Sequence, residues 1–396
     1  MSDHAVSTAK TALSQLASLD ASDAKSHDEI VRQCQSVVDA LQSPLQVAGN
    51  LISSITMYPS LVALENLGVF QRLTHGPLTA AQIAQQTGAD HDLVVRLMRV
   101  AVAWGYIAET GPESYIGTAA SNVLAHPSFA AGLRYCHVLC TSTHNLPKFL
   151  KETNYVNPTG GKDGLFQYSF QTKLEHFEWN TLHPEHERDF DMFMTIPRTS
   201  GAPWPTQFNA AKLIFEDGVT INPTAPLYVD IGGGYGQDLA HVKKELQSFP
   251  YTLSNGQLVV EDRPAVIDDV PADMRDESFT YVKHDFFNPQ PIKGARVYSF
   301  KTVLHNWADD QAVEILKNTA QSFTPGYSKL WILDRVVPET GADKVTAWQD
   351  MIMMATLGAL ERTREQWAQL LAKAGLKIVS VQTMPDHFGL IEAMLA

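Results

Sequence analysis

Pro226-Leu-Tyr-Val-Asp-Ile-Gly-Gly-Gly-Tyr-Gly236 is the stretch that most narrows the choice of fold. Residues 227–231 are apolar, β-branched or aromatic apart from Asp230, which predicts a buried strand. Four glycines follow within five positions, and glycine permits both positive φ angles and close approach of a ligand to the backbone. Apolar residues at helical spacing begin after Gln237. A strand, a glycine-rich turn and a helix in this order form the first unit of a doubly wound nucleotide-binding fold.

The spacing of the glycines helps to select the ligand. A dinucleotide-binding turn needs glycine at its first, third and sixth positions. Counted from Gly232, the third position is Gly234 but the sixth is Gln237. No lysine follows the glycines as it does in a phosphate-binding loop. These features favour a ligand without phosphate, such as S-adenosylmethionine (SAM), whose cationic amino-acid end could meet Asp230. A purely structural turn is the alternative interpretation of this stretch taken alone.

The chain beyond these glycines alternates predicted strands and helices. Strands are expected at 258–262, 279–282, 295–300 and 329–333, a helix at 364–374, and a possible antiparallel pair at 377–383 and 389–394. This alternation predicts a Rossmann-like, doubly wound α/β domain with a mostly parallel sheet covered on both faces. Gly, Asn and Pro residues at 216–226 mark its boundary, so the domain is expected to span residues 216–396.

Acidic residues lie near the ends of successive predicted strands, where ligands of such sheets bind. Asp262 ends the second strand, and its carboxylate could accept hydrogen bonds from ribose hydroxyls. Asp285 and Phe286 follow the third strand and suit an adenine, with a carboxylate for the amine and a ring for the face. Each acid alone is more often a turn residue or a helix cap. Together with Asp230 they predict a cofactor site.

A histidine follows the fourth predicted strand. That strand leads through Lys301 to His305, just before a helix whose first turn is acidic. His305 is either a solvated residue at a helix start or a base at the rim of the cofactor site. Asp334 is expected to end the fifth strand, and Glu361 follows the apolar, Met-rich segment 347–360. Two carboxylates from separate elements could converge on the imidazole, fix its tautomer and stabilise its cation.

The first 118 residues carry a different pattern. Helical spacing, a short helix capped by a threonine, a helix after Asp90 and a hairpin at 106–116 predict a winged-helix domain. DNA binding is one hypothesis for such a domain, but its third helix offers only Arg96 and Arg99. A dimerisation or substrate-covering role is favoured. Residues 119–215 are predicted to be helical, with aromatic residues that either fill a core or line a cavity for an aromatic substrate.

Composition restricts the class of protein further. The 396 residues include 30 Lys and Arg and 43 Asp and Glu, for a net charge of −13. This balance argues against partners such as nucleic acid or an anionic membrane surface. Three cysteines without metal-ligand spacing predict a reducing compartment, no disulfide and no metal site. The N-terminus has no signal-peptide pattern and no apolar run of about 18 residues is expected, so the prediction is a cytoplasmic protein.

Taken together, these motifs resemble the plant-type SAM-dependent O-methyltransferases, and most of all their fungal secondary-metabolite branch. The stretches that carry the resemblance are residues 229–236, 260–264, 284–287, 303–307 and 361–367. It covers nearly the whole chain. The resemblance implies a class I methyltransferase domain at 216–396, a helical substrate-lining region at 119–215, a winged-helix dimerisation domain at 1–118, and a homodimer. It also implies methyl transfer to a hydroxyl of a small aromatic or polyketide-type metabolite.

The resemblance also assigns residues. It implies that SAM is held by Gly232, Asp262, Asp285, Phe286 and Lys301. His305 matches the family's general base, and Asp334 and Glu361 match the two acids that brace it. The segment 347–360 matches the substrate-lining helix, which makes Met351, Ile352 and Thr356 pocket candidates. Simple core filling is the alternative role for the methionines.

The chain departs from the family after the catalytic histidine, where Asn306 stands in place of the usual aspartate and removes a charge near the base. A second function follows from the same resemblance. Fungal pericyclases of 2-pyridone pathways share the pattern, bind SAM, and catalyse dehydration and cycloaddition or rearrangement without methyl transfer. Arg198 lies where such proteins carry an active-site arginine, but the one available for comparison has Arg-Asp in place of His305-Asn306. The retained histidine favours methyl transfer, because a positioned base is what that reaction needs.

Overall fold

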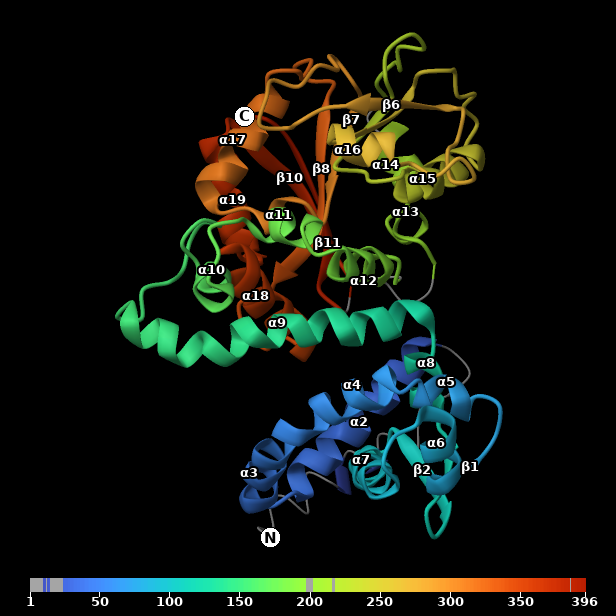
Figure 1. The fold of residues 1–396 in the computed structure, drawn as a ribbon. Coiled ribbons are helices and arrows are strands. Elements are labelled where there is room, and N and C mark those ends of the chain that lie inside the picture. The colour runs from blue at the N-terminus through green and yellow to red at the C-terminus, as the bar shows by residue number, and fades with distance from the viewer. Residues whose placement is uncertain (1–9, 12, 15–23, 197–201, 216–217, 385) are drawn as a thin grey trace. The chain divides into compact units, whose positions relative to one another are not determined.

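The computed structural model describes residues 10–11, 13–14, 24–196, 202–215, 218–384 and 386–396 (Figure 1). The chain forms two compact units, residues 1–137 and 138–396. The predicted helical segment 119–215 contributes to both units, because the helix α9 (Pro127–Glu152) runs across the boundary between them.

The first unit is helical with a small sheet. Its strands β1 (Leu78–Thr79), β2 (Ile107–Gly111) and β3 (Ser114–Gly117) pair antiparallel in the order β1-β3-β2. Its helices are α2 (Ala24–Leu41), α3 (Pro44–Ser53), η1 (Ser54–Thr56), α4 (Met57–Asn66), α5 (Val69–Leu73), α6 (Ala80–Thr87), α7 (His91–Ala103) and α8 (Ala119–Leu124). The predicted caps are present, since Thr79 accepts from the N–H of Gln82 and Asp90 from that of Leu93. This arrangement agrees with the predicted winged-helix pattern.

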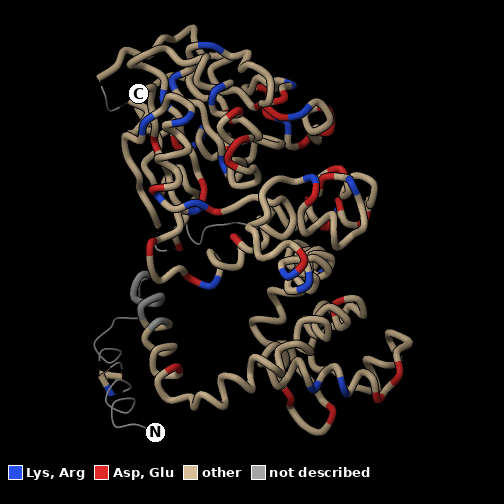
Figure 2. Tube along the Cα trace, turned by 90° about the vertical axis from the view of Figure 1, so that its left-hand side faces the viewer, with Lys and Arg blue, Asp and Glu red and all other residues tan. Residues whose placement is uncertain are grey.

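The charged residues that the structure describes in this unit do not form a basic face. The third helix of the pattern, α7, carries Arg96 and Arg99 beside the acidic Asp92, and the few basic residues of the unit are interleaved with acidic ones (Figure 2). A protein that binds the DNA backbone needs several clustered cations. The distribution therefore supports a role other than DNA binding.

One apolar run in this unit was not expected from the sequence. Residues Pro44–Asn66, which include α3 and α4, form a helical stretch of 23 residues with mean hydropathy 1.4, long and apolar enough to cross a membrane by length and composition alone. The expectation that no such run exists was wrong. Single polar residues such as Asn50 interrupt the run and hide it from a search for consecutive apolar residues. Leu45, Leu51 and Ile55 on this run are 75–82% exposed in the single chain. An exposed apolar face of this kind is typical of an interaction surface.

The second unit is built on one mixed sheet. Its main path has the order β10-β11-β8-β7-β4-β5-β6, and β9 pairs with β8 (Figure 1). Strands β6, β5, β4, β7 and β8 are parallel, while β11 and β10 are antiparallel, as predicted for the C-terminal pair. The strands are β4 (Tyr228–Ile231), β5 (Leu258–Asp262), β6 (Phe279–Lys283), β7 (Val297–Lys301), β8 (Lys329–Val337), β9 (Arg362–Thr363), β10 (Leu376–Thr383) and β11 (Phe388–Leu395).

Helices cover both faces of this sheet. Because successive side chains of a strand point to opposite faces, Val229 packs in the cluster that contains α17 and α19, whereas Tyr228 packs in the cluster that contains α13, α14 and α15. The helices are α10 (Leu165–Phe170), α11 (His176–Thr181), α12 (Pro184–Met194), α13 (Trp204–Gln207), α14 (Ala210–Phe215), α15 (Gln237–Gln247), α16 (Pro264–Asp268), η2 (Leu304–Asn306), α17 (Asp309–Ala320), α18 (Lys344–Leu357) and α19 (Arg364–Lys373). The predicted doubly wound α/β architecture is confirmed.

The topology fixes where a ligand can bind. Strand β4 lies between β5 and β7, so the strand order reverses on either side of it. In open α/β sheets the crevice beyond the carboxyl ends of the strands at such a switch point holds the ligand. The residues that follow β4, β5, β6 and β7 are therefore the candidates for ligand binding.

Candidate active site

The glycine-rich turn between β4 and α15 requires glycine for conformational and steric reasons. Gly232, Gly234 and Gly236 have φ angles of +72°, +58° and +92°, which L side chains rarely adopt. A Cβ on Gly232 would lie 2.8 Å from a methyl group of Val303. The turn therefore packs directly against the segment that carries His305.

Asp262 holds this turn in place. Its Oδ2 accepts a hydrogen bond from the N–H of Gly234 at 2.9 Å, and its Oδ1 accepts one from the N–H of Arg263 at 2.7 Å. It is half-buried at the end of β5, as the sequence predicted. Asp285 and Phe286 follow β6; Asp285 is exposed, and Phe286 packs on Phe287 with ring centroids 5.3 Å apart. Contacts of these residues with SAM stay a prediction.

An acid that sequence reasoning missed connects to Lys301. Asp238, in the first turn of α15, lies 2.8 Å from Nζ of Lys301 and accepts a hydrogen bond from the indole N–H of Trp204 at 3.0 Å. From sequence, Asp238 is an ordinary helix-start acid. Only the fold brings it to the end of β7.

Asp230 lies beneath the glycine-rich turn rather than at its open edge. It is 3% exposed, and its Oδ2 has no hydrogen-bond partner among the described residues. Burial is the main reason that the pKa of Asp230 rises to about 8; Asp238 raises it further, and Lys301 opposes the shift. An unsatisfied carboxyl beside two other acids suits a cation, so these residues fit the SAM that the sequence predicts.

SAM binding at pH 7 is expected to release about one proton from Asp230. The raised pKa keeps this carboxyl protonated in the SAM-free protein, while a nearby cation favours the carboxylate. Because the pKa of Asp230 is higher in the folded protein than in the unfolded chain, its contribution to the free energy of unfolding is fully present below about pH 4. That contribution is lost as the pH rises through 8. Calorimetric titration in buffers of different ionisation enthalpy measures the release, and Asp230→Asn should abolish it. Buffer-independent heats for the wild-type protein would contradict the prediction.

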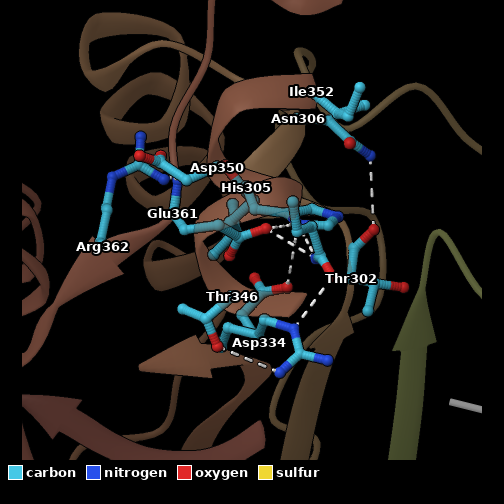
Figure 3. A network of polar contacts seen from close by, with 12 residues as sticks. Thr302, His305, Asn306, Asp334, Thr346, Asp350, Ile352, Glu361 and Arg362 are labelled. Atoms are coloured by element: carbon cyan, nitrogen blue, oxygen red, sulfur yellow. Dashed lines mark hydrogen bonds and ion pairs between the residues drawn. The ribbon is translucent and has the colours of Figure 1, made fainter. Parts of the chain in front are cut away.

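His305 meets the two predicted acids. It lies in η2, directly after β7, and is 3% exposed. Its Nδ1 lies 2.7 Å from Oε1 of Glu361 and 3.9 Å from Oδ1 of Asp334 (Figure 3). The convergence that the sequence suggested is thus present, although the catalytic roles stay predictions. One detail was wrong: Asp334 does not end its strand, because β11 and β9 pair with β8 and extend it to Val337.

The close contact sets the tautomer of the imidazole. Burial by itself raises the pKa of the Glu361 carboxyl, but the contact with His305 and a hydrogen bond from Gln349 outweigh it and hold that pKa below its ordinary value. Glu361 is therefore an anion at neutral pH, and it accepts the Nδ1–H of His305. Nε2 is left as the nitrogen that carries the basic lone pair.

The turn that carries His305 is locked by the neighbour of Glu361. Arg362 is fully buried; its guanidinium donates to the carbonyl oxygens of Leu304 at 3.1 Å and Trp307 at 2.8 Å, and to Asp309 at 2.9 Å. It thus ties both ends of the turn to β9. Arg362 was not predicted as a site residue, although its place next to Glu361 was a signal for it.

Asn306 has a structural use that aspartate could not fulfil. Its side-chain amide donates to the carbonyl oxygen of Thr302 at 3.3 Å (Figure 3). Thr302 has φ = +51°, a strained value for a β-branched residue. A carboxylate at position 306 has no N–H to donate. The amide therefore supports the strained turn beside His305.

The predicted substrate residues differ in their exposure and in their hydrogen bonds. Met351 is 41% exposed, and Ile352 is half-buried. Thr356 is 4% exposed and its hydroxyl donates to the carbonyl oxygen of Ile352 at 2.6 Å, so its polar group is engaged within α18. Arg198 lies outside the described residues.

The end of α18 is fixed by a close backbone approach. Gly358 has φ = +59°, its carbonyl oxygen accepts from the N–H of Gly160 at 2.9 Å, and an added Cβ would lie 2.3 Å from the carbonyl oxygen of Gly160. The loop at 157–164 is thereby joined to the helix that carries the predicted substrate residues.

Gly358→Ala is expected to lower the free energy of unfolding by about 1–3 kcal/mol more than Gly256→Ala does. Gly256 has φ = +83° with no atom within 4 Å of an added Cβ, so both variants share the conformational penalty of about 1–2 kcal/mol and only one adds a clash. Chemical denaturation measures the difference. Equal losses would show that the loop and helix end are not tightly joined.

Comparisons with known proteins identify the family of this chain. An O-methyltransferase dimerisation domain matches residues 50–127, and an O-methyltransferase domain matches residues 218–377. The O-methyltransferase asqD of Emericella nidulans is 35% identical over 83% of this chain and 84% of its own. The demethylsterigmatocystin 6-O-methyltransferase of Aspergillus flavus is 34% identical over 90% of each chain.

Solved structures extend the similarity to the whole fold. A structure described as a pericyclic reaction enzyme has a TM-score of 0.85 at 27% identity, covering 99% of this chain and 100% of its own. LepI in complex with SAM has a TM-score of 0.86 at 27% identity and 99% coverage of both chains. OxaC in complex with sinefungin and meleagrin has a TM-score of 0.84 at 26% identity, covering 99% of this chain and 98% of its own.

Proposed function

Because the chain belongs to the SAM-dependent O-methyltransferase family, with SAM as its cofactor, we propose that it methylates a hydroxyl of a small aromatic or polyketide-type metabolite with His305 as general base. The observation that carries this proposal is the buried 2.7 Å contact between Nδ1 of His305 and Glu361, on a turn that packs against the glycine-rich turn. One relative is named for methylation at position 6 of demethylsterigmatocystin, which supports an acceptor of similar chemistry.

The residues divide the chemistry between them. SAM, when bound, supplies a sulfonium methyl group that is already a good electrophile. A phenol with pKa about 10 is mostly protonated at neutral pH, so its oxygen needs a base. Nε2 of His305 would take the proton of the acceptor hydroxyl as its oxygen becomes the nucleophile, a contribution of about 10²- to 10⁴-fold. Glu361 and Asp334 stabilise the imidazolium that results.

The cofactor half of the site acts by positioning. The glycine-rich turn, Asp262 and Asp285 would hold the adenosine portion, and the acids around Lys301 would balance the cationic end. Holding both reactants in line can supply about 7–11 kcal/mol of the rate enhancement. The acceptor would lie along α18, near Met351 and Ile352.

A pericyclic reaction is the second candidate. It is favoured by the similarity of the whole chain to a structure described as a pericyclic reaction enzyme. The His305–Glu361 pair favours methyl transfer, because a dedicated proton acceptor is what a phenol or enol acceptor requires.

Incubation of the purified protein with candidate hydroxylated metabolites and methyl-labelled SAM separates the two candidates. Methyl transfer predicts a product that gains one labelled methyl group by mass spectrometry. An isomerised or dehydrated product without label would overturn methyl transfer in favour of the pericyclic function.

The homodimer is part of the same proposal, with the exposed apolar face of α3 and η1 as its contact. Leu51→Asp is expected to convert a dimer into monomers by sedimentation velocity, because it places a charge on that face. Leu182→Asp, at a side chain 65% exposed in the second unit, is the control and should leave the dimer intact. A dimer that survives Leu51→Asp would exclude this face as the contact.

A further inference from the structure

A glutamine on α18 contacts both members of the buried pair. Nε2 of Gln349 donates to Oε1 of Glu361 at 2.7 Å and lies 3.3 Å from Nδ1 of His305. Oε1 of Gln349 accepts from Nε of Arg335 at 2.9 Å. Because an arginine only donates, this contact fixes the orientation of the amide, with its oxygen toward Arg335 and its nitrogen toward Glu361.

Arg335 is itself held firmly. It is 8% exposed, directly follows Asp334 on β8, and donates to the carbonyl oxygen of Asp386 and to Oγ1 of Thr346. The hydroxyl of Thr346 donates in turn to Asp343, the residue that caps α18. The amide of Gln349 is thus connected to β8 and to the start of its own helix.

The next residue of α18 holds the backbone of Glu361. Oδ1 of Asp350 accepts a hydrogen bond from the N–H of Glu361 at 2.9 Å (Figure 3). Two consecutive residues of one helix therefore fix both the main chain and the carboxylate of Glu361. This helix also carries the predicted acceptor-lining residues, so its position and that of the His305 partner are coupled.

Both donors meet a single carboxylate oxygen. Oε1 of Glu361 accepts hydrogen bonds from Nδ1 of His305 and Nε2 of Gln349, each at 2.7 Å. Its Oε2 is buried with no hydrogen-bond partner in the described part of the chain. A partial rotation of the carboxylate would weaken both bonds together. Two donors on one oxygen also favour the ionised carboxylate over the acid.

From this geometry we propose that Gln349 is a positioning residue: its amide N–H keeps Glu361 turned toward Nδ1 of His305, so that Nε2 is the basic nitrogen. The inference rests on the proposed function for its kinetic consequence, but the tautomer of His305 can be measured without any turnover. The sequence carried no signal for this role, since position 349 lies within an apolar, Met-rich helix.

Two substitutions separate the effect of the Gln349 amide N–H from the effect of side-chain packing. Gln349→Met keeps the side-chain volume and removes both hydrogen bonds. Gln349→Glu keeps an acceptor for Arg335 but offers no N–H to Glu361. We expect each to lower kcat by about 10- to 100-fold, the range seen for outer partners of metal-binding histidines, with the Kd of SAM unchanged. Gln369→Met is the control, because Gln369 donates to Glu365 at 3.0 Å on the exposed face of α19.

If Gln349 served only to pack α18 or to hold Arg335, Gln349→Glu would restore activity that Gln349→Met loses. That outcome would overturn the proposal, as would unchanged kcat in both variants. The same samples, labelled with ¹⁵N-histidine, report the tautomer, with the His305 signals assigned by their loss in His305→Asn. We expect the Nδ1–H form in the wild type and a larger share of the Nε2–H form in both variants.

An unchanged tautomer in the variants would also overturn the proposal, whatever the kinetics. If the wild-type protein transfers no methyl group to any acceptor, the proposed function fails, while the tautomer measurement still decides the role of Gln349.

Discussion

Replacing His305 with alanine is expected to lower kcat for methyl transfer by about 10²- to 10⁴-fold while the Kd of SAM changes by no more than a few-fold. The imidazole is the only group that the proposed mechanism uses to remove the acceptor proton. It faces Glu361 through Nδ1 and is not among the residues assigned to SAM. Single-turnover kinetics and calorimetric titration of SAM on the same preparation measure the two quantities.

The alanine variant leaves the Glu361 carboxylate buried without its partner, which costs about 3–5 kcal/mol and risks misfolding. His305→Asn is therefore the second variant, because its amide can still donate toward Glu361 but cannot act as a base. Its loss of kcat should match that of His305→Ala with better stability. Full activity in a folded variant of either kind would remove His305 from the mechanism.

Asp262→Ala is expected to act on binding instead, raising the Kd of SAM by about 10- to 150-fold. The carboxylate accepts two backbone N–H groups that shape the glycine-rich turn, and it is predicted to accept from the ribose as well. Loss of hydrogen bonds to a charged group is worth about 1.5–3 kcal/mol. At saturating SAM, kcat should fall much less than affinity does.

Asp276→Ala is the matched control for this prediction. Asp276 also accepts a backbone N–H, from Ser278 at 2.9 Å, and it pairs with Lys243 at 2.6 Å, but it does not contact the turn. It should lower stability and leave the Kd of SAM unchanged. Similar losses of affinity in both variants would mean that Asp262 acts through general stability and not at the cofactor.

The sequence predicted the features that depend on local pattern. The strand before Gly232, the alternation of strands and helices, and the position of Asp262 at a strand end all follow from short-range periodicity and turn chemistry. The approach of Glu361 and Asp334 to His305 was suggested because each acid lies near the end of an element. The structure brings Glu361 within hydrogen-bond distance and Asp334 to 3.9 Å.

The remaining features depend on packing between distant elements. Asp230 was predicted to meet the cationic end of SAM, but the local pattern did not show that β4 is buried on both faces, which places the carboxyl beneath the turn and raises its pKa. Asp238 and Lys301 are 63 positions apart, and Gln349 and Glu361 belong to different elements, so no local pattern reveals either contact. The exposed run at 44–66 was missed because polar residues interrupt it, although its mean hydropathy is high.

A crystal structure of the protein with S-adenosylhomocysteine and a methyl acceptor identified by labelling tests the proposed geometry most directly. We predict that the acceptor oxygen lies about 2.6–3.2 Å from Nε2 of His305 and faces the cofactor sulfur, with Glu361 still bonded to Nδ1. An acceptor hydroxyl beyond hydrogen-bond reach of His305, with another base beside it, would contradict the assignment of His305 as general base.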